Sequence, residues 1–181
     1  KINADIVSCK YFDSDFIPFE GEEEDWFDIV IDYCQPLLKI LDYQNMPIDI
    51  QKWMLIFLGR LLYEVGALDD WQIIPYILGV GGSGKSTILG NIAKAFYEPE
   101  NVGILGNNVE KKFGVSSIVG KLLFIAPEIK KDLCLEQAEF QSMISGETMS
   151  VNVKFQKTQN VKFTTPGIMA GNEIPQYTDN V

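Results

Sequence analysis

A glycine-rich segment that ends in lysine and serine, residues 79–86, constrains the fold of this chain more than any other feature. It reads GVGGSGKS and fits the pattern G-x-x-x-x-G-K-[ST]. The apolar run before it, 73–78, predicts a strand, and the pattern after it, 86–96, predicts a helix. Glycines at this spacing let successive backbone N–H groups point into one concavity, which together with a helix N-terminus binds phosphate groups.

The residues of this segment have separate expected roles at a phosphate site. The Lys85 side chain would reach the β- and γ-phosphates of a nucleotide, and the Ser86 hydroxyl would bind Mg²⁺. The alternative is a glycine-rich turn without a ligand, which the flanking strand and helix disfavour. The candidate nucleotide-binding residues are Gly79, Gly81, Gly82, Ser83, Gly84, Lys85, Ser86 and Thr87.

Short apolar runs alternate with helical patterns through the second part of the chain. Further strands are predicted over 102–105, 122–126 and 167–171, and helices over 110–118 and 135–144. Residues 149–155 and 161–163 read as a β-hairpin whose turn is 156–160. This order predicts an α/β fold with a mainly parallel, helix-covered sheet and a β-hairpin insertion.

Three segments are expected along the 181 residues: a linker or docked extended segment at 1–21, a small α-helical subdomain at 22–70, and the α/β core at 71–181. The net charge of −10 lies in the first two segments, because residues 1–70 hold five Lys/Arg and fifteen Asp/Glu, whereas 71–181 hold ten of each. Acidity of the chain as a whole therefore does not exclude nucleic-acid binding by the core. The core reads as truncated at its C-terminus.

The predicted helical subdomain contains two helical patterns. In the first, Pro36 should break the helix near Cys34. The second follows Pro47, and Gly66 is its expected terminator. Apolar helices with an acidic exterior suit either a collar for oligomerisation or a plain bundle.

Cysteine and histidine usage excludes several site classes. Cys9, Cys34 and Cys134 lie far apart, and the chain has no histidine, which excludes a zinc-finger module and any histidine-based general base. The odd cysteine count and wide spacing predict free thiols in a reducing, intracellular compartment. No apolar run approaches the roughly 18 residues of a membrane span, so no membrane partner is expected.

Polar residues follow two of the predicted buried strands. Glu128 ends the run LLFIAPE, where a carboxylate would hold Mg²⁺ or orient water, alone or together with Asp132 or another acid. A surface glutamate after a core strand is the alternative. Asn172 follows the predicted strand 167–171, and its amide could hydrogen-bond a γ-phosphate or the attacking water. Asparagine before a proline turn is, however, common.

The predicted hairpin lies in a locally positive stretch. Residues 151–172 contain three lysines, Lys154, Lys157 and Lys162, and no acid. Lys157 is nearest the predicted turn. Such lysines either contact an anionic partner or are simply exposed on a hairpin.

Taken together, the segments VGGSGKST, KLLFIAPEI, EQAEFQSMISGE and AGNEIPQYTDN resemble the superfamily 3 helicases of DNA viruses and plasmids, most of all the poxvirus-type primase-helicases of large DNA viruses. The resemblance covers about residues 66–181. It implies a P-loop NTPase core of the AAA+ type that assembles as a ring, with a hexamer expected, and acts in viral DNA replication. A host cytoplasm, viral factory or nucleus would be the location.

The resemblance also implies roles for individual residues. Lys85 and Ser86 would be Walker A residues, Glu128 the Walker B acid and Asn172 the first sensor, with ATP and Mg²⁺ as cofactors. The hairpin would project into the ring channel, where Lys157, and next Lys154, would contact single-stranded DNA. A primase domain or other replication proteins are further implied partners.

Two departures from the family pattern keep other functions open. Pro127 stands where an acid often precedes Glu128, and the chain holds one arginine, Arg60, which lies outside the core where an arginine finger is expected. The alternatives are a nucleotide-binding ring scaffold that does not hydrolyse ATP, and a DNA packaging or remodelling ATPase without unwinding activity.

Overall fold

The computed structural model describes residues 18, 21, 26–106, 115–131, 135–152 and 157–175. The chain divides into two compact units, Lys1–Gln51 and Lys52–Val181. These compact units do not test whether residues 22–70 form a functional subdomain, which stays a prediction. Among the described residues, no helix combines the length and apolar character needed to cross a membrane.

The first unit contains helices α1 (Trp26–Tyr33) and α2 (Gln35–Tyr43) and the start of α3 (Ile48–Arg60). The break at Cys34 confirms the predicted effect of Pro36, which cannot continue α1 but suits the first turn of α2. Gln51 joins the end of α2 to the start of α3, because its Nε2 donates to Asp42 Oδ1 at 2.7 Å and to the Met46 carbonyl at 2.9 Å.

Helix α3 ends earlier than the sequence predicts. The expected terminator was Gly66, but the helix ends at Arg60, and the chain continues in tight turns in which Leu61 N–H donates to the Leu58 carbonyl. The expectation was therefore wrong by about a turn and a half. The last turn tightens into hydrogen bonds from Leu61 to Leu58 and from Leu62 to Gly59, and the chain then turns back so that residues 69–73 meet the buried Arg60 side chain.

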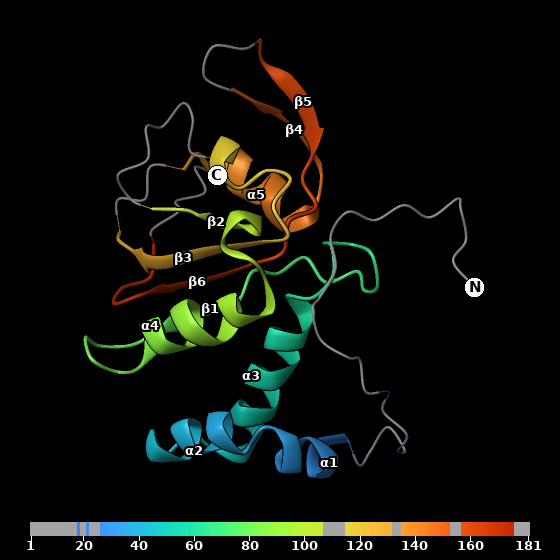
Figure 1. The fold of residues 1–181 in the computed structure, drawn as a ribbon. Coiled ribbons are helices and arrows are strands. Elements are labelled where there is room, and N and C mark those ends of the chain that lie inside the picture. Colours follow the sequence, from blue (N-terminus) through green and yellow to red (C-terminus); the bar gives the residue numbers. More distant parts are fainter. Residues whose placement is uncertain are drawn as a thin grey trace. The chain divides into compact units, whose positions relative to one another are not determined.

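A four-stranded parallel sheet forms the centre of the second unit (Figure 1). Its order is β1 (Tyr76–Leu78), β6 (Gly167–Gly171), β3 (Leu123–Ile129) and β2 (Val102–Ile104). Every residue of β6 is buried, as expected for a strand between two neighbours in a covered parallel sheet. The α/β class and the mainly parallel sheet predicted from the sequence are confirmed.

Helical segments cover the sheet. The predicted helix at 86–96 is a continuous segment of three kinds of turn, α4 (Lys85–Thr87), η2 (Ile88–Ile92) and η3 (Ala93–Phe96), and η2 lies against β3 and β6. Short 3₁₀ turns η4 (Pro99–Asn101) and η5 (Val115–Ser117) flank β2 in the chain. Only the end of the predicted helix at 110–118 falls within the described residues. The main core cluster contains Phe124, Met143, Phe163 and Met169.

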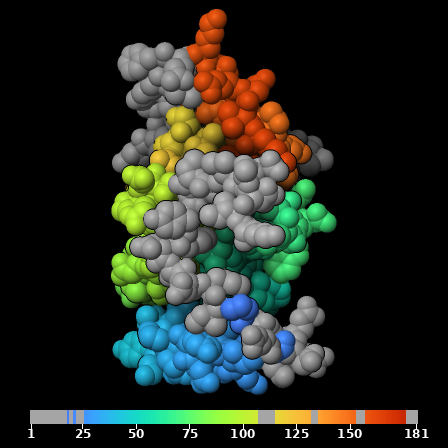
Figure 2. Space-filling view, turned by 45° about the vertical axis from the view of Figure 1, so that its right-hand side comes forward, coloured from blue at the N-terminus to red at the C-terminus, as the bar shows by residue number. Residues whose placement is uncertain are grey.

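The predicted hairpin is present as an antiparallel pair, β4 (Thr148–Val151) and β5 (Gln159–Lys162), but its bounds differ from the prediction: β4 ends before 155, and β5 begins at Gln159, inside the predicted turn 156–160. The pair follows helix α5 (Gln137–Ser145), whose C-cap is Gly146 with a φ of 70°. Met149 and Val151 are buried in the core, whereas the alternate residues of β4 are exposed. The pair stands off the sheet in Figure 1 and forms the orange ridge at the top of Figure 2.

Candidate functional site

Three neighbouring strands end at one edge of the sheet, and each supplies a predicted site residue there. Strand β1 leads into the glycine-rich loop, β6 is followed directly by Asn172, and Glu128 is the last residue but one of β3. Because the three strands are parallel and adjacent, their carboxyl ends lie side by side. This is the edge at which open α/β sheets bind ligands.

The glycines of the loop are required by its backbone. Gly82 and Gly84 have φ values of 81° and 87°, in the left-handed region that glycine adopts without strain. Gly79 needs space instead, since a Cβ there would lie 2.7 Å from Ser83 Oγ. The Gly79 N–H donates to the Gly171 carbonyl at 3.2 Å, which ties the loop to the end of β6.

Lys85 is the centre of the polar contacts at this edge. Its Nζ donates to the Gly79 carbonyl at 2.7 Å, the Val80 carbonyl at 2.8 Å and Asn172 Oδ1 at 2.9 Å. A longer contact of 3.4 Å reaches Ser83 Oγ. Within the described part of the chain, these partners are all neutral oxygens, so no carboxylate neutralises the ammonium charge.

Glu128 lies in a β-bulge near the end of β3. Ala126 pairs with Met169 and Ile129 with Gly171, so two residues of β3 stand opposite one residue of β6. This bulge accommodates Pro127, which has no N–H to give to a sheet. The predicted strand at 122–126 therefore extends to Ile129, and the Glu128 side chain is exposed at the edge.

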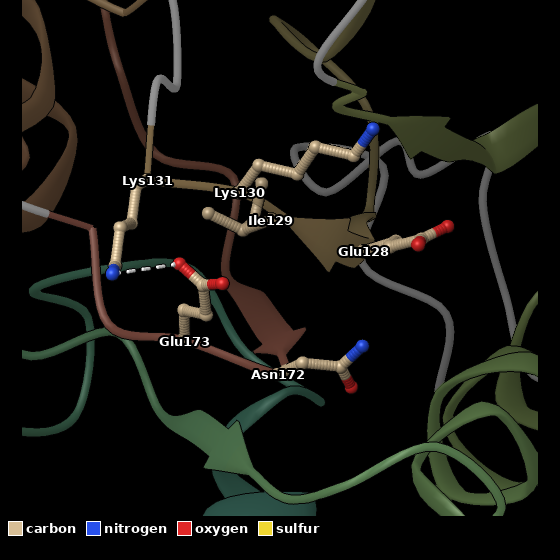
Figure 3. A pocket seen from close by; sticks show the side chains of 6 residues that line it. All are labelled: Glu128, Ile129, Lys130, Lys131, Asn172 and Glu173. Carbon is tan, nitrogen blue, oxygen red and sulfur yellow. Dashed lines mark ion pairs between the residues drawn. The ribbon is translucent and has the colours of Figure 1, made fainter.

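A cavity of about 310 Å³ lies between the ends of β3 and β6 (Figure 3). In this view the side chains of Glu128 and Asn172 point the same way, and Lys131 forms an ion pair of 3.2 Å with Glu173. The residues lining the cavity are Glu128, Ile129, Lys130, Lys131, Asn172 and Glu173.

The predicted magnesium ligands lie on different elements of the second unit. Ser86 is exposed in the first turn after the glycine-rich loop, and Glu128 is exposed near the end of β3, which β6 separates from β1. Among the described residues, no three Cys, Asp or Glu side chains gather closely enough to hold a metal ion by themselves. Mg²⁺ commonly takes only one or two protein ligands and completes its shell with water and phosphate oxygens, so the residues fit this ion. Asp132, the possible helper of Glu128, lies outside the described residues.

One of the two predicted DNA-contacting lysines falls within the described residues. Lys157 is exposed two residues before β5, and the pair β4–β5 lies away from α4 in Figure 1. Lys154 lies outside the described residues. Hydrogen bonds between side chains cross the exposed part of the hairpin, from Ser150 to Asn160 at 2.8 Å and from Thr158 to Asn152 at 2.8 Å.

Arg60 has a structural role that the sequence analysis missed. Its guanidinium donates twice to the Asp69 carboxylate, at 3.0 Å each, and also to the carbonyls of Trp71 and Ile73. Tyr63 adds a hydrogen bond of 2.5 Å to the same carboxylate. The hydrogen bond from Arg60 lowers the pKa of Asp69 to about 2. The cluster fixes the segment that leads into β1.

Residues 77–180 match the model of a family described as "Family of unknown function (DUF5906)", which is more than half of the chain. The chain belongs to this family. The DUF5906 match begins within β1 and spans the glycine-rich loop, Glu128 and Asn172. No curated protein matches the sequence.

The DUF5906 chain is similar in fold to solved apo structures of the NrS-1 C-terminal region. One has 18% identity and a TM-score of 0.52, covering 86% of this chain and 34% of that one. A second has 21% identity and a TM-score of 0.56, with coverage of 75% and 32%. A third has 19% identity and a TM-score of 0.54, with coverage of 90% and 37%. The chain thus spans about a third of the length of these structures.

Proposed function

We propose that this chain is part of an ATP-dependent DNA helicase of viral replication, which translocates on single-stranded DNA as a ring and hydrolyses ATP at subunit interfaces. The observation that carries the proposal is the 2.9 Å hydrogen bond from Lys85 Nζ to Asn172 Oδ1. It joins a lysine of a phosphate-binding pattern to an amide 87 residues further on, at the ligand-binding edge of a parallel sheet. The family resemblance of the sequence motifs supplies the finer assignment.

The charge at this edge supports a polyphosphate ligand. The described partners of Lys85 Nζ are uncharged oxygens, so phosphate oxygens that replace the two loop carbonyls would form a charge-assisted hydrogen bond in their place. Glycines 82 and 84 keep the loop backbone free of side chains where a ligand would approach it. A phosphate oxygen that also replaced Asn172 Oδ1 at Lys85 would leave the Asn172 amide available to a γ-phosphate or a water molecule.

The remaining residues have roles that suit hydrolysis. Magnesium, when bound, supplies positive charge for the phosphate oxygens. Ser86 would hold the ion through its hydroxyl and Glu128 through its carboxylate, and Glu128 would also orient water. Lys157 would contact the backbone of single-stranded DNA, with Lys154 as the second candidate, because lysines neutralise phosphates without reading sequence.

The bulge at Pro127 favours one alternative, a nucleotide-binding ring scaffold. A single exposed carboxylate at the end of β3 has no adjacent acid in sequence to share the work of holding Mg²⁺ and orienting water. Such a protein would bind ATP tightly and hydrolyse little of it.

ATP turnover with and without single-stranded DNA separates these functions in the intact protein. A helicase should show DNA-stimulated turnover that Lys85→Ala lowers about 100-fold, the usual scale for loss of one preorganised charge contact. Lys157→Ala should keep basal turnover and lose the stimulation by DNA. Lys39→Ala, which changes an exposed lysine of α2, is the matched control and should behave like the parent.

Two results would contradict the proposal. Tight ATP binding without turnover in the parent would favour the scaffold. DNA-stimulated turnover without displacement of a paired strand would favour a packaging or remodelling ATPase.

A further inference from the structure

Tyr76 reaches from the start of β1 to the residue that follows Asn172. Its hydroxyl donates to the backbone carbonyl of Glu173, 97 residues further along the chain. Tyr76 pairs with Met169 in the parallel register, and Gly171 stands two residues beyond Met169 on the same face of β6. A side chain that leans along the strand direction from Tyr76 therefore passes over Gly171 toward the end of β6.

Gly171 leaves the space that this contact needs. A Cβ at position 171 would lie 2.0 Å from Tyr76 Oη and 2.4 Å from the Ile129 carbonyl. The backbone of Gly171 is not in the left-handed region, so glycine is required here by space rather than by conformation. The Tyr76 hydroxyl thus occupies the place of a side chain directly before Asn172.

The turn after β6 is held by a second, more exposed contact. The ion pair between Lys131 and Glu173 joins side chains that are 61% and 52% exposed. Exposed ion pairs of this kind contribute little to fixing a geometry. Burial and the nearby Glu173 carboxylate raise the pKa of Tyr76, so its hydroxyl keeps its proton and remains a donor at neutral pH. The Tyr76 hydrogen bond therefore joins β1 to the residue after Asn172, beside the bonds from Gly79 N–H to the Gly171 carbonyl and from Lys85 to Asn172.

We propose that Tyr76 is a positioning residue for Asn172. By fixing the carbonyl of Glu173, it orients the backbone on both sides of Asn172, so that Oδ1 of Asn172 faces Lys85 at 2.9 Å. This inference rests on the proposed function for its effect on turnover, because Asn172 acts there on the γ-phosphate or on water. The positioning of the Asn172 side chain by Tyr76 does not depend on nucleotide.

The test uses Tyr76→Phe, which removes the hydroxyl and keeps the ring. Tyr97→Phe is the matched control, because the Tyr97 hydroxyl also donates to a backbone carbonyl, that of Leu61, at 2.8 Å. The first readout is the ¹⁵N–¹H signal of the Asn172 side-chain amide in the intact protein without nucleotide, identified from its loss in Asn172→Asp. We expect this signal to shift or broaden in Tyr76→Phe and to stay in place in Tyr97→Phe. An Asn172 signal unchanged in Tyr76→Phe overturns the inference.

The second readout is steady-state ATP turnover. We expect Tyr76→Phe to lower kcat about tenfold through misplacement of Asn172 while KM for ATP changes less than about twofold. Adding Tyr76→Phe to Asn172→Ala should lower kcat no further, which a general loss of stability would not reproduce. A kcat equal to that of the parent also overturns the inference. If the parent itself neither binds nor hydrolyses ATP, the proposed function fails, and the Asn172 signal still decides whether Tyr76 positions this side chain.

Discussion

Replacing Asp69 by asparagine should destabilise the second compact unit in a pH-dependent way. Asp69 receives hydrogen bonds from Arg60, Tyr63 and the Trp71 backbone N–H, and it faces the Arg60 guanidinium, whose side chain is 5% exposed. Asparagine keeps the size and one acceptor oxygen but removes the charge that balances the buried guanidinium. An unbalanced buried charge is costly, so the variant should unfold more easily.

The magnitude follows from the pKa of Asp69. The hydrogen bond from Arg60 lowers it from an ordinary 3.8 to about 2. A change of that size corresponds to roughly 2.5 kcal/mol, and the partial exposure of the carboxylate reduces the figure to about 2 kcal/mol. Because the pKa is lowered by folding, this contribution is present in full above pH 3.8 and is lost as the pH falls toward 2.

Urea unfolding of the parent and Asp69→Asn between pH 2 and pH 7 measures this contribution as a difference. The free energy of unfolding of the parent should exceed that of Asp69→Asn by about 2 kcal/mol at pH 6, and this difference should fall below about 1 kcal/mol near pH 2. Asp70→Asn, the exposed neighbour, is the control and should stay close to the parent throughout. A stability difference below about 0.5 kcal/mol at pH 6, or one that does not change with pH, would show that Asp69 does not balance the Arg60 charge.

Three further predictions concern the site. Gly171→Ala should lower the free energy of unfolding by about 1–3 kcal/mol, because its Cβ would meet Tyr76 Oη and the Ile129 carbonyl. Gly81→Ala, which has open space around it, should lower it by less than about 1 kcal/mol, and urea unfolding of both variants measures the difference. Glu128→Gln should lower ATP turnover about 100-fold and leave ATP binding within about threefold, as measured by turnover and calorimetry, and equal turnover would remove Glu128 from the site. Lys131→Ala should change stability by less than about 0.5 kcal/mol because its ion pair with Glu173 is exposed, and a larger loss in thermal unfolding would contradict that estimate.

The sequence predicted the parts of the fold that depend on local pattern. Strand β6 has the predicted bounds, Gly167–Gly171, because an unbroken apolar run lies between Pro166 and the polar Asn172. The hairpin and α5 are also predicted, with bounds that differ from the structure by a few residues. The nearness of Lys85 and Asn172 could be inferred because parallel strands bring their carboxyl ends to one edge.

Features that depend on register and on buried polar groups were not predictable in the same way. The extension of β3 through Pro127 requires a bulge opposite β6, and proline alone argued for an earlier end. The end of α3 at Arg60 is followed by a return of the chain to the Arg60–Asp69 ion pair, which no helical period indicates. The Tyr76 contact joins residues 97 positions apart, and only the pairing of β1 with β6 brings them together.

Calorimetric titration with ATP and Mg²⁺, on the intact protein and on Lys85→Ala, measures whether the glycine-rich loop, Lys85 and Asn172 form a nucleotide site at one edge of the sheet. The parent should bind ATP saturably, and Lys85→Ala should bind it at least about tenfold more weakly, because a charge-assisted contact to phosphate is lost. Absence of binding by the parent, or equal affinity in the two proteins, would contradict a nucleotide site there.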